Sequence, residues 1–189
     1  MDKILIVSAN EKSKDTLCEL LKEYDDIQIV TTTSASKARR YAANNELSIA
    51  VINTPLREEF GTELSIDLSR LNIGTLLIVK SEISEEISAD VESFGVLVIS
   101  KPIIKSLFYQ SFRLQMSIKN RLISLKKEND KLKNKIEEIK IVDRAKLILI
   151  ENENLSENEA HKYIEKEAMN RRLSRYQIAK EILAKYNIS

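Results

Sequence analysis

The stretch SIAVINTPLREEFG, residues 48–61, decides the fold of the N-terminal half. Ile49, Val51 and Ile52 form a short apolar run rich in β-branched residues, which is typical of a strand buried on both faces of a parallel sheet. The polar residue Asn53 ends the run, and a proline and a glycine follow, as in a loop. We therefore predict a buried strand with Asn53 at its carboxyl end.

Four further apolar runs of similar length lie along the chain, at residues 4–7, 27–30, 75–79 and 96–99. The segments between the runs have helical spacing of their apolar residues, for example Leu64, Leu68 and Leu71. Five strands that alternate with helices predict an α/β fold, a doubly wound five-stranded parallel sheet. A ligand site in such a sheet forms at the carboxyl ends of the strands, which here lie near Ser8, Asn53, Lys80 and Lys101.

The composition is that of a soluble, helix-rich globular protein. Of 189 residues, 43% are hydrophobic and 31% are charged, with three glycines and two prolines. No apolar run approaches the roughly 18 to 20 residues that span a bilayer. The first residues also lack the cleavage signature of a signal peptide, so we expect a cytoplasmic protein with no membrane partner.

Side chains suited to catalysis are scarce. Cys18 is the only cysteine and His161 the only histidine, which excludes a disulfide framework and His clusters. Cys18 lies among leucines and is expected to be a buried helix thiol, and His161 a surface or packing residue. The sequence contains no glycine-rich phosphate loop and no HExxH motif. We predict a protein that is not an enzyme and uses neither cofactor nor metal.

Charge is segregated along the chain, although the net charge is only +1. Residues 1–118 hold 13 basic and 17 acidic side chains, whereas residues 119–142 hold 8 basic and 4 acidic ones. Residues 143–189 hold 9 basic and 8 acidic side chains. We therefore expect a polyanionic partner to bind the C-terminal half.

A single long helix is predicted from Ile104 to about Asn152, where the sequence has neither glycine nor proline. Residues 118–142 of this helix carry a heptad pattern. Alternating a and d positions of the seam are occupied by Leu122, Leu125, Asn129, Leu132, Ile136 and Ile139. One asparagine at an a position favours a parallel dimer in fixed register. We predict a parallel coiled-coil homodimer; the alternative is a helix packed on its own sheet.

Two capping boxes follow the long helix. In each, a serine is followed three residues later by Glu or Gln, as in Ser156 with Glu159 and Ser174 with Gln177. They predict helices at about 156–169 and about 174–186. Together with the end of the long helix, these two helices form a small three-helix domain.

The five-strand region resembles the receiver domain of response regulators. That family has an acidic pair after the first strand, a phosphoaccepting aspartate after the third, a Ser or Thr after the fourth and Lys-Pro after the fifth. The corresponding residues here are Ser8 with Ala9, Asn53, Lys80, and Lys101 with Pro102. Only the Lys-Pro pair is retained.

The resemblance implies a degenerate phosphorylation site. An acyl phosphate requires a carboxylate nucleophile and a Mg²⁺ ion held by anionic oxygens. Asn53 is a poor nucleophile, and Ser8 and Ala9 carry no charge. If Pro55 were the family's loop proline, Val51 would match the acceptor instead, and it is not an aspartate either.

Two interpretations of Lys80 and Lys101 follow from the loss of the carboxylates. The two lysines could bind an anionic metabolite or an acidic peptide. Alternatively, their ammonium groups reach solvent or pair with Glu11, Glu58 or Glu82. We favour the second interpretation.

The C-terminal segment, residues 142–183, resembles the ANTAR family, RNA-binding antitermination modules that follow a receiver domain and a coiled coil. Ala145 and Lys146 match that family's Ala-Lys pair, although Leu147 replaces its usual glycine. Further matches are dispersed, at Leu149, Ser156, Glu157, Ala160, Ala168, Met169, Ala179 and Ile182. The expected domains are a receiver-like domain at 1–117, a coiled coil at 118–142 and an RNA-binding domain at 143–189.

This resemblance implies that a dimer binds paired RNA hairpins in a nascent transcript and prevents a terminator from forming. Hairpin loops expose bases for stacking and phosphates for Lys and Arg. The residues expected to contact RNA are Arg144, Lys146, Lys162, Tyr163, Lys166, Arg171, Arg172 and Arg175, with Tyr176 beside them. Without a phosphoacceptor, we expect constitutive dimerisation, or control by a protein or small ligand on the receiver surface.

Other interpretations stay open. Tyr163 suits core packing as well as base stacking, and Lys162 and Lys166 suit an ordinary solvated helix face. A DNA-binding regulator with a helix-turn-helix ranks below RNA, because the last helix has many apolar residues and few to read the major groove. A third possibility is a protein-binding scaffold with no affinity for nucleic acid.

Overall fold

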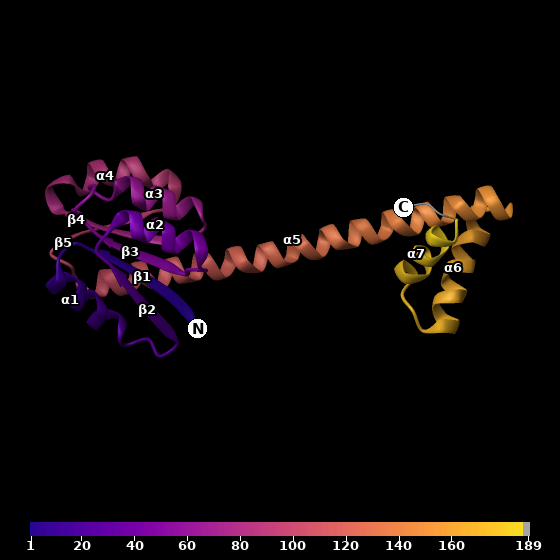
Figure 1. Ribbon diagram of the computed structural model, residues 1–189, viewed down its shortest axis with the longest axis horizontal. Helices are drawn as coiled ribbons and strands as arrows, with labels where there is room; N and C mark the ends of the chain where they lie inside the picture. Colours follow the sequence, from indigo (N-terminus) through magenta and orange to yellow (C-terminus); the bar gives the residue numbers. More distant parts are fainter. Residues whose placement is uncertain (187–189) are drawn as a thin grey trace. The chain divides into compact units, whose positions relative to one another are not determined.

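The computed structural model of the protein describes residues 1–186 (Figure 1). The chain forms two compact units, Met1–Ile123 and Ser124–Ser189, and each is described by itself. The division between the units falls within the segment expected to be a coiled coil, so the three-domain division stays a prediction. Residues 187–189 of the expected RNA-binding domain lie outside the described residues.

The first unit contains a five-stranded parallel sheet with the order β2-β1-β3-β4-β5, which confirms the predicted fold class. The chain runs outward from β1 to β2 and then crosses back to β3 on the other side of β1, which creates a switch point between β1 and β3. Each strand overlaps its predicted run: β1 is Asp2–Ser8, β2 Ile27–Thr32, β3 Ile49–Asn53, β4 Gly74–Lys80 and β5 Leu97–Lys101.

Helices cover both faces of the sheet (Figure 1). One face packs against α2 (Ala35–Asn44), α3 (Thr62–Arg70) and α4 (Ser84–Val91). The other face packs against α1 (Glu11–Leu21) and the first turns of α5 (Lys105–Glu153). Short 3-10 turns at Ser81–Ile83 and Glu92–Phe94 flank α4. Successive strand residues alternate between the two cores, and all of β3 is buried, as predicted.

The connection from β3 to α3 requires a glycine. Gly61 has φ = 114°, and a Cβ atom there would lie 3.2 Å from side-chain carbons of both Ile52 and Thr54. A left-handed backbone in so little space favours glycine over any residue with a side chain. The loop after Asn53 is thereby held close to the end of β3.

The first turns of α5 are anchored to the sheet by apolar and polar contacts. Phe108 and Phe112 are fully buried. The buried amide of Gln115 donates to the carbonyl oxygens of Thr75 at 3.2 Å and Gly95 at 2.9 Å. One turn further, Lys119 pairs with the carboxylate of Asp2 at 2.6 Å.

The second unit packs the end of α5 against α6 (Glu157–Arg171) and α7 (Arg175–Lys185). Its core includes Ala145, Leu149, Ile164, Ala179 and Leu183. Both predicted capping boxes are present at the starts of α6 and α7, and α6 continues two residues beyond its predicted end.

Residues 121–140 of α5 are exposed along their whole length in the single chain. No helix within residues 1–186 is long and apolar enough to cross a membrane.

Candidate nucleic-acid interface

The carboxyl end of the sheet holds a neutral hydrogen-bonded pair. Ser8 and Asn53 lie opposite each other in the register of β1 and β3, and both are buried. The Asn53 amide donates to Ser8 Oγ at 3.1 Å, and that hydroxyl donates to the carbonyl oxygen of Asn10 at 3.0 Å. Ala9 between them has no polar side-chain atom. Within residues 1–186, no group of three or more His, Cys, Asp or Glu residues is placed to hold a metal ion.

The two lysines at this edge behave differently. Lys80 is exposed and reaches solvent, as predicted. Lys101 instead donates to the carbonyl oxygen of Thr54 at 2.5 Å. Burial, and then the neighbouring charge of Lys80, lower the pKa of the Lys101 amine.

The prediction is wrong for Lys101, which binds a backbone carbonyl oxygen, and two of the three expected carboxylate partners are engaged elsewhere. Glu11 pairs with Lys14 on the same helix. Glu58 accepts hydrogen bonds from the hydroxyl groups of Ser34 and Ser36, which lower the pKa of its carboxyl group. Glu58 thereby binds the first residues of α2, and Glu11 binds a lysine one turn further along α1.

The predicted dimer seam lies uncovered on α5. Its five apolar residues are about half exposed, at 48% for Leu122, 46% for Leu125, 56% for Leu132, 54% for Ile136 and 53% for Ile139. Asn129 is exposed between them. The middle of the stripe, residues 125–136, lies on a wholly exposed part of the helix, whereas Ile139 also lines a groove of the second unit.

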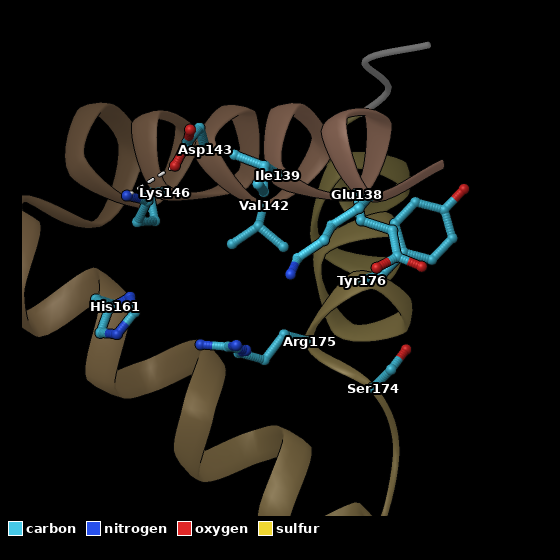
Figure 2. A pocket seen from close by; sticks show the side chains of 10 residues that line it. Glu138, Ile139, Val142, Asp143, Lys146, His161, Ser174, Arg175 and Tyr176 are labelled. Atoms are coloured by element: carbon cyan, nitrogen blue, oxygen red, sulfur yellow. Dashed lines mark ion pairs between the residues drawn. The ribbon is translucent and has the colours of Figure 1, made fainter. Parts of the chain in front are cut away.

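A groove in the second unit brings together charged, aromatic and apolar side chains from α5, α6 and α7 (Figure 2). Its volume is about 500 Å³. Figure 2 shows Val142 on the α5 side facing the groove and Arg175 extending from the start of α7 toward His161. We call it the α5–α7 groove; its lining consists of Lys135, Glu138, Ile139, Val142, Asp143, Lys146, His161, Ser174, Arg175 and Tyr176.

Carboxylates hold two cations of the α5–α7 groove, Lys146 and Arg175, in place. Lys146 pairs with Asp143 at 2.8 Å and with Glu157 at 3.6 Å, and the Asp143 carboxylate raises the pKa of the lysine. Glu165 on α6 lies 3.3 Å from His161 and 3.2 Å from Arg175. An apolar wall beside fixed cations is suited to an unstacked base and its phosphate.

Two adjacent arginines at the turn between α6 and α7 differ in their interactions. Arg171 makes two hydrogen bonds to the carboxylate of Glu181, at 2.5 and 3.0 Å, and Glu181 raises the pKa of the arginine. This pair joins α6 to α7. Arg172 has a left-handed backbone with φ = 53°, is exposed, and makes no ion pair with any residue of the described chain.

The remaining expected RNA contacts lie on the outer side of α6. Lys162, Tyr163 and Lys166 are exposed, whereas Ala160 and Ile164 of the same helix are buried. Tyr163 is 46% exposed, so the core-packing interpretation is wrong. The structure therefore divides the predicted residues into a groove pair (Lys146 and Arg175), an α6 face (Lys162, Tyr163 and Lys166) and a turn pair (Arg171 and Arg172), with Arg144 exposed on α5.

Sequence reasoning missed several lining residues of the α5–α7 groove. Lys135 belongs to the predicted coil and His161 follows a core alanine, so neither position indicates a site in the sequence. Tyr176 was noted, but not its cation–π contact, in which the Lys180 amine lies 4.7 Å from the ring centre.

Comparison with known proteins gives a family match for the C-terminal segment and a fold match for the N-terminal region. Residues 130–183 match the family model of the ANTAR domain. The N-terminal region is similar to solved receiver domains, which shows its fold. A response regulator receiver domain protein from Clostridium thermocellum is 13% identical with a TM-score of 0.56, covering 65% of this chain and 99% of that one. A CheY-like receiver domain protein from Methanospirillum hungatei JF-1 is 18% identical with a TM-score of 0.57, covering 64% and 98%.

A structure described as adenylate cyclase from Rhodopirellula baltica is also similar, at 21% identity and a TM-score of 0.59, covering 69% of this chain and 97% of that one. No curated protein matches the chain. The chain therefore contains an ANTAR domain at residues 130–183, and its N-terminal domain has the receiver fold. An ANTAR domain is an RNA-binding antitermination domain.

Proposed function

We propose that the protein is a transcription antitermination regulator that binds two RNA hairpins as a parallel dimer, without phosphorylation of its receiver-like domain. The observation that carries the proposal is that the dimer seam and the ANTAR domain overlap on one helix, α5. The seam from Leu122 to Ile139 and the ANTAR match at 130–183 share part of α5. Pairing of the seams therefore pairs the RNA-binding domains.

The exposed seam supports the dimer. Each chain offers five half-exposed apolar side chains in heptad order, and their mutual burial stabilises association. Two linked RNA-binding domains engage two linked hairpins with a higher effective concentration than either would alone. The dimer should therefore bind a transcript with paired hairpins more tightly than a transcript with one hairpin.

The end of the sheet supports independence from phosphorylation. The side chains at the position of the acceptor and acidic pair form a neutral network, Asn53 to Ser8 to the Asn10 carbonyl oxygen. Such a network has neither a nucleophilic carboxylate nor anionic ligands for Mg²⁺. The receiver-like domain then contributes a protein-binding or ligand-binding surface.

Gel-shift titration tests the proposal with purified protein, without phosphodonor or Mg²⁺, across a range of salt. The RNAs are a two-hairpin transcript and a single-hairpin control, and duplex DNA is a third probe. We expect tightest binding to the two-hairpin RNA. A preference for the duplex would favour a DNA-binding regulator, and failure to bind all three would favour a scaffold; either result would contradict the proposal.

A further inference from the structure

The charged residues that flank the seam are distributed unevenly between its two edges. Continuing the heptad from Leu122 at position a places lysine at every e position of the coil, Lys126, Lys133 and Lys140. The g positions are Arg121, Glu128 and Lys135. All six are exposed, and none forms an ion pair with another residue of the described chain.

In a parallel dimer, each g residue faces the e residue of the next heptad on the partner helix. Glu128 then faces the partner's Lys133, which is favourable. Arg121 faces the partner's Lys126, and Lys135 faces the partner's Lys140, and both pairs repel. Burial of the apolar seam favours dimerisation, whereas the charged g and e residues on balance oppose it, because two of the three pairs repel.

One of the repelling pairs adjoins the α5–α7 groove. Lys135 lines the groove together with Ile139 and Val142 on the same side of α5. The partner's Lys140, opposite Lys135 in the heptad register, therefore lies at the rim of the groove. Each groove of the dimer gains a cation from the other copy, and neither Lys135 nor Lys140 forms an ion pair within the described chain.

We propose that a phosphate of the bound RNA occupies the space between Lys135 and the partner's Lys140, so that each RNA site is shared between two copies of the chain. This inference rests on the proposed function and adds to it a coupling between RNA binding and dimerisation. A phosphate between the two lysines converts a repulsive edge into an attractive one. RNA therefore tightens the dimer, and by linkage the dimer binds RNA more tightly.

The RNA-free protein has a distinctive salt response under this arrangement. Added salt screens exposed like charges, so the wild-type dimer without RNA becomes tighter as salt rises. Affinity for RNA moves in the opposite direction, because phosphate contacts weaken with salt.

The test uses the full chain and measures dimer dissociation by sedimentation velocity, with and without a two-hairpin RNA. The decisive variant is Lys140→Glu, which turns the pair with the partner's Lys135 from repulsive to attractive. The matched control is Lys127→Glu, which makes the same charge change at an exposed f position that points away from the partner helix.

We expect Lys140→Glu to tighten the RNA-free dimer roughly three- to tenfold, as two exposed pairs change sign. The same variant should lose the RNA-induced tightening and bind RNA more weakly than Lys127→Glu does. The control should dimerise like the wild type and keep the coupling. If the wild type binds RNA but the two variants behave alike, this inference is overturned and the proposed function stands. A wild type that fails to bind RNA contradicts the proposed function itself.

Discussion

Asn53 donates its side-chain amide to the hydroxyl oxygen of Ser8 at 3.1 Å, across the paired ends of β3 and β1. Both side chains are buried and neutral, at the edge of the sheet where a doubly wound fold places its ligands. At this position the receiver family has carboxylates, whereas this chain has two neutral side chains that hydrogen-bond to each other. The two side chains therefore satisfy their buried polar atoms through each other and through the Asn10 carbonyl oxygen.

The first prediction concerns phosphotransfer. Incubation of the wild type with a small acyl-phosphate donor and Mg²⁺ should leave its intact mass unchanged, because the amide of Asn53 is not a nucleophile. Asn53→Asp alone should also stay unlabelled, because Ser8 and Ala9 supply no anionic ligand for Mg²⁺. Mass spectrometry checks both, with an active receiver domain as the positive control. Stoichiometric labelling of the wild type would show that a different acid accepts the phosphoryl group.

The second prediction concerns the anchoring of α5 to the sheet. Hydrogen bonds from Lys119 and Ser48 lower the pKa of the Asp2 carboxyl group. Because the folded pKa lies below the unfolded one, the pair stabilises the fold above about pH 4 and the stabilisation is lost as the pH falls below that range. The Asp2 side chain is 35% exposed, so solvent screens the pair, and Asp2→Asn should cost about 0.5 kcal/mol at pH 7.

Denaturant unfolding followed by circular dichroism at pH 7 and pH 3 measures this effect. The difference in stability between Asp2→Asn and the wild type should be smaller at pH 3 than at pH 7, because the lowered pKa of Asp2 lies closer to pH 3. Glu46→Gln is the control, because it removes an exposed carboxylate that pairs with no residue of the described chain. An equal loss of stability at the two pH values would exclude the ionised carboxylate as the cause.

The third prediction separates stability from RNA binding at Arg172. Its left-handed backbone disfavours a residue with a side chain, so Arg172→Gly should raise the free energy of unfolding by about 0.5–1 kcal/mol. The same change should weaken RNA binding, because an exposed cation is lost. Asn154→Gly is the matched control, since Asn154 also has a positive φ of 54° but carries no charge.

Thermal unfolding and RNA titration of both variants provide the two readouts. The control should gain somewhat less stability, because asparagine tolerates this conformation, and should bind RNA like the wild type. Unchanged RNA affinity in Arg172→Gly would remove Arg172 from the RNA interface.

The fourth prediction concerns the seam. Leu132 is 56% exposed in the single chain, so Leu132→Gln should leave the fold of each unit intact. In a dimer the change removes two buried leucines and should weaken association by more than about tenfold. Lys131→Gln, at the adjacent outward position, should dimerise normally. Sedimentation equilibrium compares them, and a monomeric wild type or an unaffected variant would refute the seam.

The sequence predicted those features that arise from local patterns. The apolar run before Asn53 was sufficient for β3, and the pairs Ser156 with Glu159 and Ser174 with Gln177 were sufficient for the starts of α6 and α7. These signals lie within a few residues of one another, so the sequence contains them directly.

Features formed by distant residues were not predictable. The ion pair of Arg171 with Glu181 and the presence of Lys135 and Tyr176 in one groove depend on how three helices pack. Lys101 finds the Thr54 carbonyl oxygen rather than a carboxylate for the same reason, because the two residues are 47 positions apart. The lysines and arginines of the C-terminal half predicted a polyanionic partner. Tertiary packing decides which of these cations are already paired with a carboxylate, as Arg171 is, and which are exposed, as Arg172 is.

The stoichiometry of the RNA complex tests the central claim most directly. Native mass spectrometry of the unphosphorylated full chain with a two-hairpin RNA should show two protein chains on one RNA, and disruption of either hairpin should abolish the 2:1 complex at the same concentration. A single chain bound to the intact RNA, or a 2:1 complex that forms equally well on duplex DNA, would contradict the account.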